Sequence, residues 1–378
     1  MKLDPDKIEP AKKRPAKKSP ATISPVRLGP AKKGPALPAA FYPASVLSLL
    51  ALALWLLPPA AFEALYVRNL YPALTALSTG LTGWTVLPLG IAVLPPLVGL
   101  VLWRTLLTGK VTPLTVRLAG AALLAVVLLA CYSLIWGLNY RRPPLPEVLG
   151  LAAATHAPSE MTGLAEDMLA WILAYRDSDP NAAEALAAVS EELERLAIRL
   201  DRPVRLPAGV KLLPSGSLLR AGYAGMVFPF TLEPQVDAAL APASRVSIGA
   251  HELAHVAGFA AESDADLAAL LAGLRADNGF ARYATALSLL ARMLGALPSE
   301  ERSALIDRLP ERAVDDLAEA RARSARYFRP TVSSRITAVY DRLLRSQGVS
   351  GGVAQYGQAP QLAAIARVQG LLPEPPAR

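Results

Sequence analysis

The sequence contains few of the side chains from which cross-links and metal sites are usually built. Its 378 residues include one cysteine, Cys131, and three histidines, His156, His251 and His255. A single cysteine excludes a disulfide framework and a zinc site made of cysteine thiolates. Any metal site in this chain must therefore draw its remaining ligands from carboxylates.

Positive charge is also scarce outside the first 40 residues, although the formal net charge is +8. Residues 1–40 hold ten Lys and Arg against three Asp and Glu, which leaves +1 for the rest of the chain. A folded basic surface is absent from this pattern, so we expect no nucleic-acid partner. The tail repeats Pro-Ala-Lys-Lys, and we expect it to be extended and disordered. It is either a solvated topology signal or a segment attracted to anionic lipid.

Long apolar runs dominate residues 41–140. Three of them have no Lys, Arg, Asp or Glu: Ala44–Phe62, Trp84–Trp103 and Leu118–Leu138. Each has about the 20 residues that a helix needs to cross a bilayer. We therefore expect three transmembrane helices, with the lipid bilayer as a partner.

The distribution of Lys and Arg predicts the orientation of these spans. The tail is rich in both, and Lys110 and Arg117 lie between the second and third spans, whereas Arg68 is the one such residue between the first two. Under the positive-inside rule the N-terminus is cytoplasmic. We expect a multi-pass protein of the cytoplasmic membrane, with residues 141–378 outside the cytoplasm.

Residues 141–378 have the composition of a soluble, Ala- and Leu-rich helical domain. Two pieces, Val210–Leu213 and Val227–Thr231, favour β-structure and are bounded by Gly and Pro. The predicted fold class is mainly α: three membrane helices, then a predominantly helical α+β domain with one or two short strands.

A metal-binding motif lies within this domain. Residues 251–255 read His-Glu-Leu-Ala-His, which is HExxH. Residues four apart share one helix face, so His251 and His255 can point at one ion. Glu252 sits beside that face, where it can act as a general base on a water molecule without binding the metal. The expected ion is Zn²⁺.

The third ligand is less directly encoded. Gly258 can end the helix and reverse the chain, which brings Glu262 back toward the histidines. Glu262 is the preferred ligand, and Asp266 or a carboxylate elsewhere is the alternative. Glu262 and Asp264 are also typical of the charges at a helix N-terminus. We interpret His156 as an exposed loop residue.

The segment before the helix with the HExxH motif, residues 222–231, is the candidate for holding a substrate peptide along an edge strand. A plain structural hairpin is the alternative. Tyr223 in this segment is a candidate for stabilising an oxyanion.

The chain resembles the bacterial membrane proteins grouped as domain of unknown function 3810. The matching pieces are residues 136–145, 222–236, 251–265 and 339–357. The resemblance implies three N-terminal membrane helices and a zincin-like C-terminal domain. Glu262, Ala265 and Asp266 form an ExxAD pattern similar to that of the membrane metallopeptidases related to the CAAX-processing and heat-shock proteases, where the Glu binds zinc.

Together these features predict a membrane-anchored, zinc-dependent metallopeptidase that hydrolyses peptide bonds in a peptide or protein substrate. The rival interpretation is a membrane-anchored binding or sensory module whose zinc site is structural or inactive. The intact Glu252 favours the enzyme, because a purely structural site does not need it.

Overall fold

The computed structural model describes residues 41–107, 113–151, 158–334, 336 and 359–376. The basic tail, His156 and the whole matching piece 339–357 lie outside the described residues. Residues 40–378 form one compact unit. The described helices and strands run in the order α1 Phe41–Leu56, α2 Pro59–Phe62, the π-helix η1 Glu63–Leu70, α3 Tyr71–Thr82, α4 Leu89–Leu107, α5 Leu114–Ile135, the 3-10 helix η2 Gly137–Arg141, α6 Leu145–Val148, α7 Pro158–Tyr175, α8 Ala182–Arg199, β1 Lys211–Leu213, the 3-10 helix η3 Leu219–Ala221, β2 Gly225–Phe228, β3 Glu233–Asp237, α9 Pro242–Val256, α10 Glu262–Arg275, α11 Gly279–Met293, α12 Ser299–Ile306, α13 Glu311–Tyr327 and α15 Ala359–Val368.

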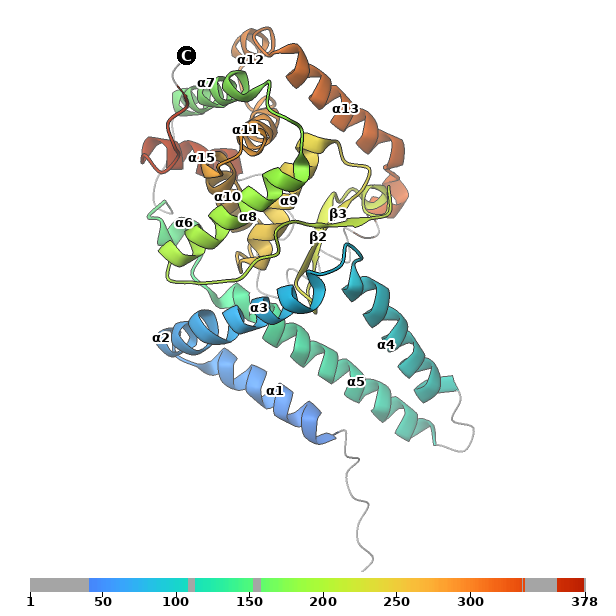
Figure 1. Ribbon diagram of the computed structural model, residues 1–378. Helices are drawn as coiled ribbons and strands as arrows, with labels where there is room; N and C mark the ends of the chain where they lie inside the picture. The colour runs from blue at the N-terminus through green and yellow to red at the C-terminus, as the bar shows by residue number, and fades with distance from the viewer. Residues whose placement is uncertain (1–40, 108–112, 152–157, 335, 337–358, 377–378) are drawn as a thin grey trace, which may run out of the picture. The chain divides into compact units, whose positions relative to one another are not determined.

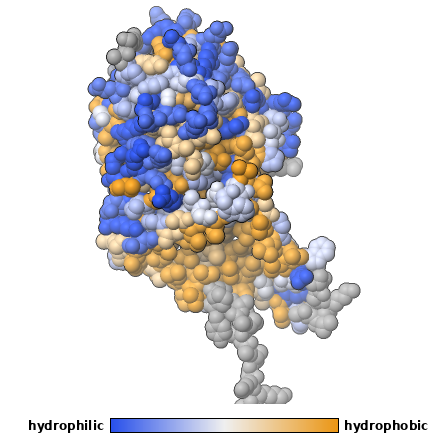
Figure 2. All heavy atoms as spheres, viewed as in Figure 1, coloured by the Kyte–Doolittle hydropathy of each residue, from blue (hydrophilic) through white to orange (hydrophobic). Residues whose placement is uncertain are grey.

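Two of the described helices are long and apolar enough to cross a membrane. They are the 18 residues Leu89–Leu106 of α4 and the 22 residues of α5. Trp103 and many of their leucines and valines are exposed, as the hydrophobic lower part of Figure 2 shows. Exposure of these apolar side chains costs no free energy if they face lipid, whereas it is unfavourable if they face water. These helices match the second and third expected spans.

The first expected span, Ala44–Phe62, does not form as a single helix. Helix α1 ends at Leu56 after 16 residues. Pro58 and Pro59 follow, and Pro59 starts the separate helix α2 because proline fits the first turn of a helix but not its interior. At 1.5 Å per residue α1 is about 24 Å long, short of the ~30 Å hydrocarbon core.

The three strands form one small sheet with the order β1-β3-β2. β1 is parallel to β3, and β2 is antiparallel to it with Gly225 opposite Val236. One or two strands were expected, and β3 is the one that the sequence did not reveal. Its residues, Glu-Pro-Gln-Val-Asp, include a proline and two acidic side chains, which are disfavoured in a central strand, yet all five are buried. The carboxylate of Asp237 accepts hydrogen bonds from the backbone N–H groups of Gly216, Leu218 and Leu219.

Glu233 of β3 links the sheet to the start of the apolar helix α4. Its buried carboxylate accepts hydrogen bonds from the backbone N–H groups of Leu89 and Gly90, at 3.0 and 2.6 Å. A carboxylate at this position satisfies free N–H groups and complements the helix dipole. Lys211 of β1 lies 3.7 Å from Glu233 and donates to the carbonyl of Thr82 at 2.6 Å.

Helix α9 lies at the centre of the helical part, packed against α8, α10 and α11 (Figure 1). Helix α7 covers the other side of α11. The core between them is apolar, and its fully buried side chains include Leu164, Leu169, Val189, Leu193, Val246, Leu253 and Phe280. The protein is thus mainly helical, as expected, and the helix that carries both motif histidines packs against three others.

Candidate metal centre

Helix α9 presents both motif histidines on one face. Pro242 occupies its first turn, and the apolar side chains Val246, Leu253 and Ala254 face the core. The remaining face carries His251 and His255, whose ring centroids are 4.6 Å apart with an interplanar angle of 87°. Both rings are largely buried, at 15% and 9% side-chain exposure. Two imidazoles are therefore close together and shielded from bulk water.

A tight turn after α9 brings the next helix back toward this face. Gly258 has φ +92°, a conformation that glycine adopts far more easily than other residues. Its N–H donates to the His255 carbonyl at 2.8 Å, and the Phe259 N–H donates to the Ala254 carbonyl at 3.2 Å. A Cβ on Gly258 would lie 2.3 Å from the guanidinium of the buried Arg142. The turn therefore requires glycine for both its backbone angle and its space.

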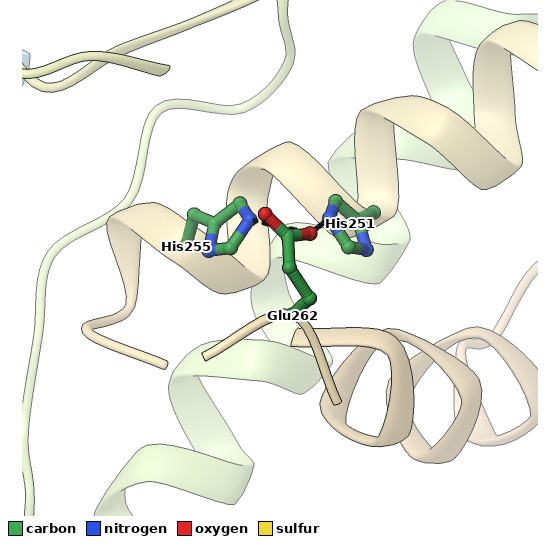
Figure 3. A group of neighbouring side chains, drawn as sticks. All are labelled: His251, His255 and Glu262. Atoms are coloured by element: carbon green, nitrogen blue, oxygen red, sulfur yellow. Dashed lines mark hydrogen bonds and ion pairs between the residues drawn. The ribbon is translucent and has the colours of Figure 1, made fainter. Parts of the chain in front are cut away.

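Glu262 is the first residue of α10, and its side chain lies between the two imidazoles (Figure 3). Its Oε2 is 3.0 Å from Nε2 of His251 and 3.6 Å from Nε2 of His255. One ligand atom from each residue lies within 4.8 Å of the other two, so the three could hold a metal ion. Tetrahedral zinc with bonds of ~2.0–2.1 Å has ligand atoms about 3.3 Å apart. The separations from Glu262 fit that spacing.

The other nitrogen of each imidazole is held by a hydrogen-bond acceptor. Nδ1 of His251 lies 3.0 Å from Oδ1 of Asp266, and Nδ1 of His255 lies 2.8 Å from the carbonyl oxygen of Phe259. Acceptors at these positions favour a proton on Nδ1, which leaves the electron pair of Nε2 free to bind a metal ion. Arg292 of α11 in turn binds Asp266 through two bonds of 2.8 and 2.6 Å.

The electrostatics of the metal-free site favour opposite charges on its members. Burial opposes a charged His251, but the hydrogen bonds that its ring donates to the carboxylates of Asp266 and Glu262 outweigh burial and raise its pKa well above the usual value. Burial also opposes a charged Glu262, yet the two histidines hold its pKa well below the usual range. For Asp266, Arg292 and His251 overcome burial and lower the pKa to about 2. The negative charges of Glu262 and Asp266 therefore favour a positive charge in this site.

Glu252 is buried beside the cluster and carries a different electrostatic signature. Burial raises its pKa to about 7, although both histidines act to lower it. Its carboxylate packs against β2, where a Cβ on Gly225 would lie 2.5 Å from its Oε1. Gly225 therefore makes the room that this carboxylate occupies. A carboxyl group with a pKa near 7 can both accept and release a proton at neutral pH.

The remaining candidates lie around this centre. Tyr223 precedes β2 by two residues, directly after the left-handed Gly222, and its proposed role as an oxyanion stabiliser stays a prediction. Asp264 points elsewhere: its Oδ2 accepts a hydrogen bond from the Leu145 N–H at 2.9 Å. Asp266 lies against a histidine ring.

Two neighbours of the site were not foreseen from the sequence. Arg292 reaches Asp266 from 26 residues further along the chain. Trp136, at the end of the apolar helix α5, lies edge-on to His255 with ring centroids 5.8 Å apart. The sequence pattern placed Trp136 at a membrane boundary but carried no signal of a contact with the motif.

The comparison with protein families confirms the expected family. A family model described as protein of unknown function (DUF3810) matches residues 66–364, which covers most of the chain and the whole cluster. The chain belongs to this family. The comparison with curated proteins and that with solved structures found no match. The family description names no activity, so the site geometry is the basis for a functional proposal.

Proposed function

We propose that this protein is a membrane-anchored, zinc-dependent metallopeptidase that hydrolyses a peptide bond in a peptide or protein substrate. The observation that carries the proposal is the cluster of His251, His255 and Glu262 with Glu252 buried beside it. Three ligands with an additional carboxyl group that is not a ligand are typical of catalytic rather than structural zinc sites. A purely structural site has four ligands and no use for Glu252.

The donor set supports zinc as the ion. Two imidazole nitrogens and one carboxylate oxygen form the His₂Glu combination of several zinc hydrolases. A zinc ion held there would supply Lewis acidity toward water and the substrate carbonyl. Asp266 and the carbonyl of Phe259 would keep both imidazoles in the orientation that binding needs.

Glu252 is the proposed general base. It takes a proton from the attacking water molecule and later gives that proton to the leaving amine. Its pKa of about 7 and its place against Gly225 suit both steps. Gly225 also belongs to β2, an edge strand of the sheet order β1-β3-β2. An edge strand next to the general base is a suitable place for a substrate backbone to pair, with Tyr223 close by in sequence.

The membrane arrangement is part of the proposal. Helices α4 and α5 would cross the bilayer, and the shorter α1, packed beside α5, would make the third crossing that separates the N-terminus from the catalytic domain. The distribution of Lys and Arg favours a cytoplasmic N-terminus and a catalytic domain outside a bacterial inner membrane. The basic tail would then meet the anionic cytoplasmic leaflet.

The decisive experiment combines metal analysis with proteolysis. Purified protein in lipid nanodiscs is assayed for bound metal and for cleavage of a peptide library, next to Glu252→Gln. We expect about one zinc per chain in both, and cleavage by the wild type alone. A wild type that binds zinc and cleaves nothing would instead indicate the binding or sensory module. Loss of zinc from Glu252→Gln would contradict the role of this residue as a base.

A further inference from the structure

Helix α3 turns polar side chains toward the protein and apolar side chains outward, which is the reverse of a surface helix in water. Its hydroxyl side chains face the rest of the protein: Thr75 accepts from the Arg205 N–H at 3.1 Å, Thr79 donates to the Arg205 carbonyl at 3.3 Å, and Ser78 donates to the carbonyl of Thr231. Its leucines face outward. A helix with apolar residues exposed and hydroxyls turned inward is suited to an apolar surrounding.

The outward face of α3 is apolar along its whole length and continues into α4. Leu77 is 58% exposed and Leu81 is 61% exposed, and Trp84, directly after the helix, is 77% exposed. These residues are spaced by four and three positions, so they form one stripe. Val86 and Leu87, also exposed, extend it to the start of α4. The stripe thus runs into the helix that is apolar enough to cross a membrane.

The same helix is attached directly to the metal centre. The Tyr71 hydroxyl donates to the carbonyl of Val256 at 2.8 Å, and Val256 follows His255 at the end of α9. From the other side, Trp136 at the end of α5 contacts the His255 ring. The second motif histidine is therefore braced between α3 and the end of a membrane helix.

We propose that the stripe of Leu77, Leu81 and Trp84 lies in the headgroup layer of the bilayer, with α3 parallel to the membrane surface. The occupant of this face is lipid, because the stripe is free of charge, is continuous with α4, and includes a tryptophan, which favours the headgroup level. Because α3 also holds α9, the metal centre is kept at the membrane surface. Resting on the proposed function, the substrate class is then a membrane-attached polypeptide cut close to the bilayer.

Spin labels can test the membrane contact without any assumption about activity. In a Cys131→Ser background, Leu77→Cys and Leu81→Cys are labelled in full-length protein in nanodiscs, with Val314→Cys as the control. Val314 is 46% exposed on α13. We expect a higher ratio of oxygen to nickel-complex collisions at 77 and 81 than at 314. Equal ratios at all three positions would overturn the proposal, as would spin–spin broadening with low access to both reagents, the sign of a second copy on this face.

The substrate class needs a separate measurement. A peptide library is offered once free in solution and once coupled to phosphatidylethanolamine headgroups of the nanodisc. We expect faster cleavage of the coupled form, and loss of that preference in Leu77→Lys/Leu81→Lys but not in Val314→Lys. Equal cleavage of both forms by the wild type would refute the substrate class. If the wild type cleaves neither form, the peptidase proposal fails with it, while the collision ratios still decide the membrane contact.

Discussion

Replacing Asp266 by asparagine isolates the contribution of one hydrogen bond to metal affinity. The substitution keeps the shape of the side chain but removes the negative charge of the carboxylate. That carboxylate accepts a hydrogen bond from Nδ1 of His251 at 3.0 Å and two from Arg292 at 2.8 and 2.6 Å. A neutral acceptor makes Nε2 less basic and holds the ring less firmly. Losing such a partner typically weakens metal binding 10- to 100-fold, which is about 1.4–2.7 kcal/mol.

Asp264→Asn is a matched control on the same helix. Asp264 is 7% exposed, and its carboxylate accepts from the Leu145 N–H rather than from a histidine. Burial raises its pKa to about 6, so neutralising it removes little charge stabilisation. Zinc affinity is measured by competition with a chromophoric chelator at constant pH. We expect a 10- to 100-fold loss for Asp266→Asn and wild-type affinity for Asp264→Asn.

The comparison also decides where the metal sits. Glu262→Gln should lose more affinity than Asp266→Asn, because it removes a ligand and not the support of one. Equal losses at Asp264 and Asp266 would show that the ion is not bound between the two imidazoles and Glu262. Unchanged affinity in Asp266→Asn would refute the argument that this carboxylate supports His251.

Two further predictions follow from the same region. Gly258→Ala should lower the free energy of unfolding by about 2–5 kcal/mol, of which ~1–2 come from the left-handed backbone and ~1–3 from the clash with Arg142. Gly295→Ala, with nothing within 4 Å of its Cβ, should be neutral. Thermal unfolding in detergent measures both variants, and equal midpoints would contradict the strain argument. Because the pKa of His251 is raised well above 6.5 in the metal-free protein, metal must displace its proton, so zinc affinity should rise up to about tenfold from pH 6 to pH 7. Calorimetry in two buffers of different ionisation enthalpy counts that proton, and an affinity independent of pH would show that His251 is neutral before metal binds.

The local parts of the site were within reach of the sequence. His251 and His255 are four residues apart on a helix, so their common face follows from helix geometry alone. Glu262 is 11 residues from His251, and a single glycine turn spans that separation. The same locality applies to α4 and α5, whose length and composition indicate membrane helices without reference to the rest of the fold.

The parts that depend on distant residues were decided only by the tertiary structure. Strand β3 contains a proline and buried acidic side chains, which local propensity disfavours, and its Glu233 can be buried because it accepts a hydrogen bond from the start of α4, 143 residues away along the chain. Arg292 reaches Asp266 through the packing of α11 on α10, and no local pattern encodes that pairing. The direction in which α3 faces was equally hidden, because a helix with leucines on one side and hydroxyls on the other fits a soluble core as well as a bilayer. Packing places its hydroxyls inward and thereby exposes its leucines.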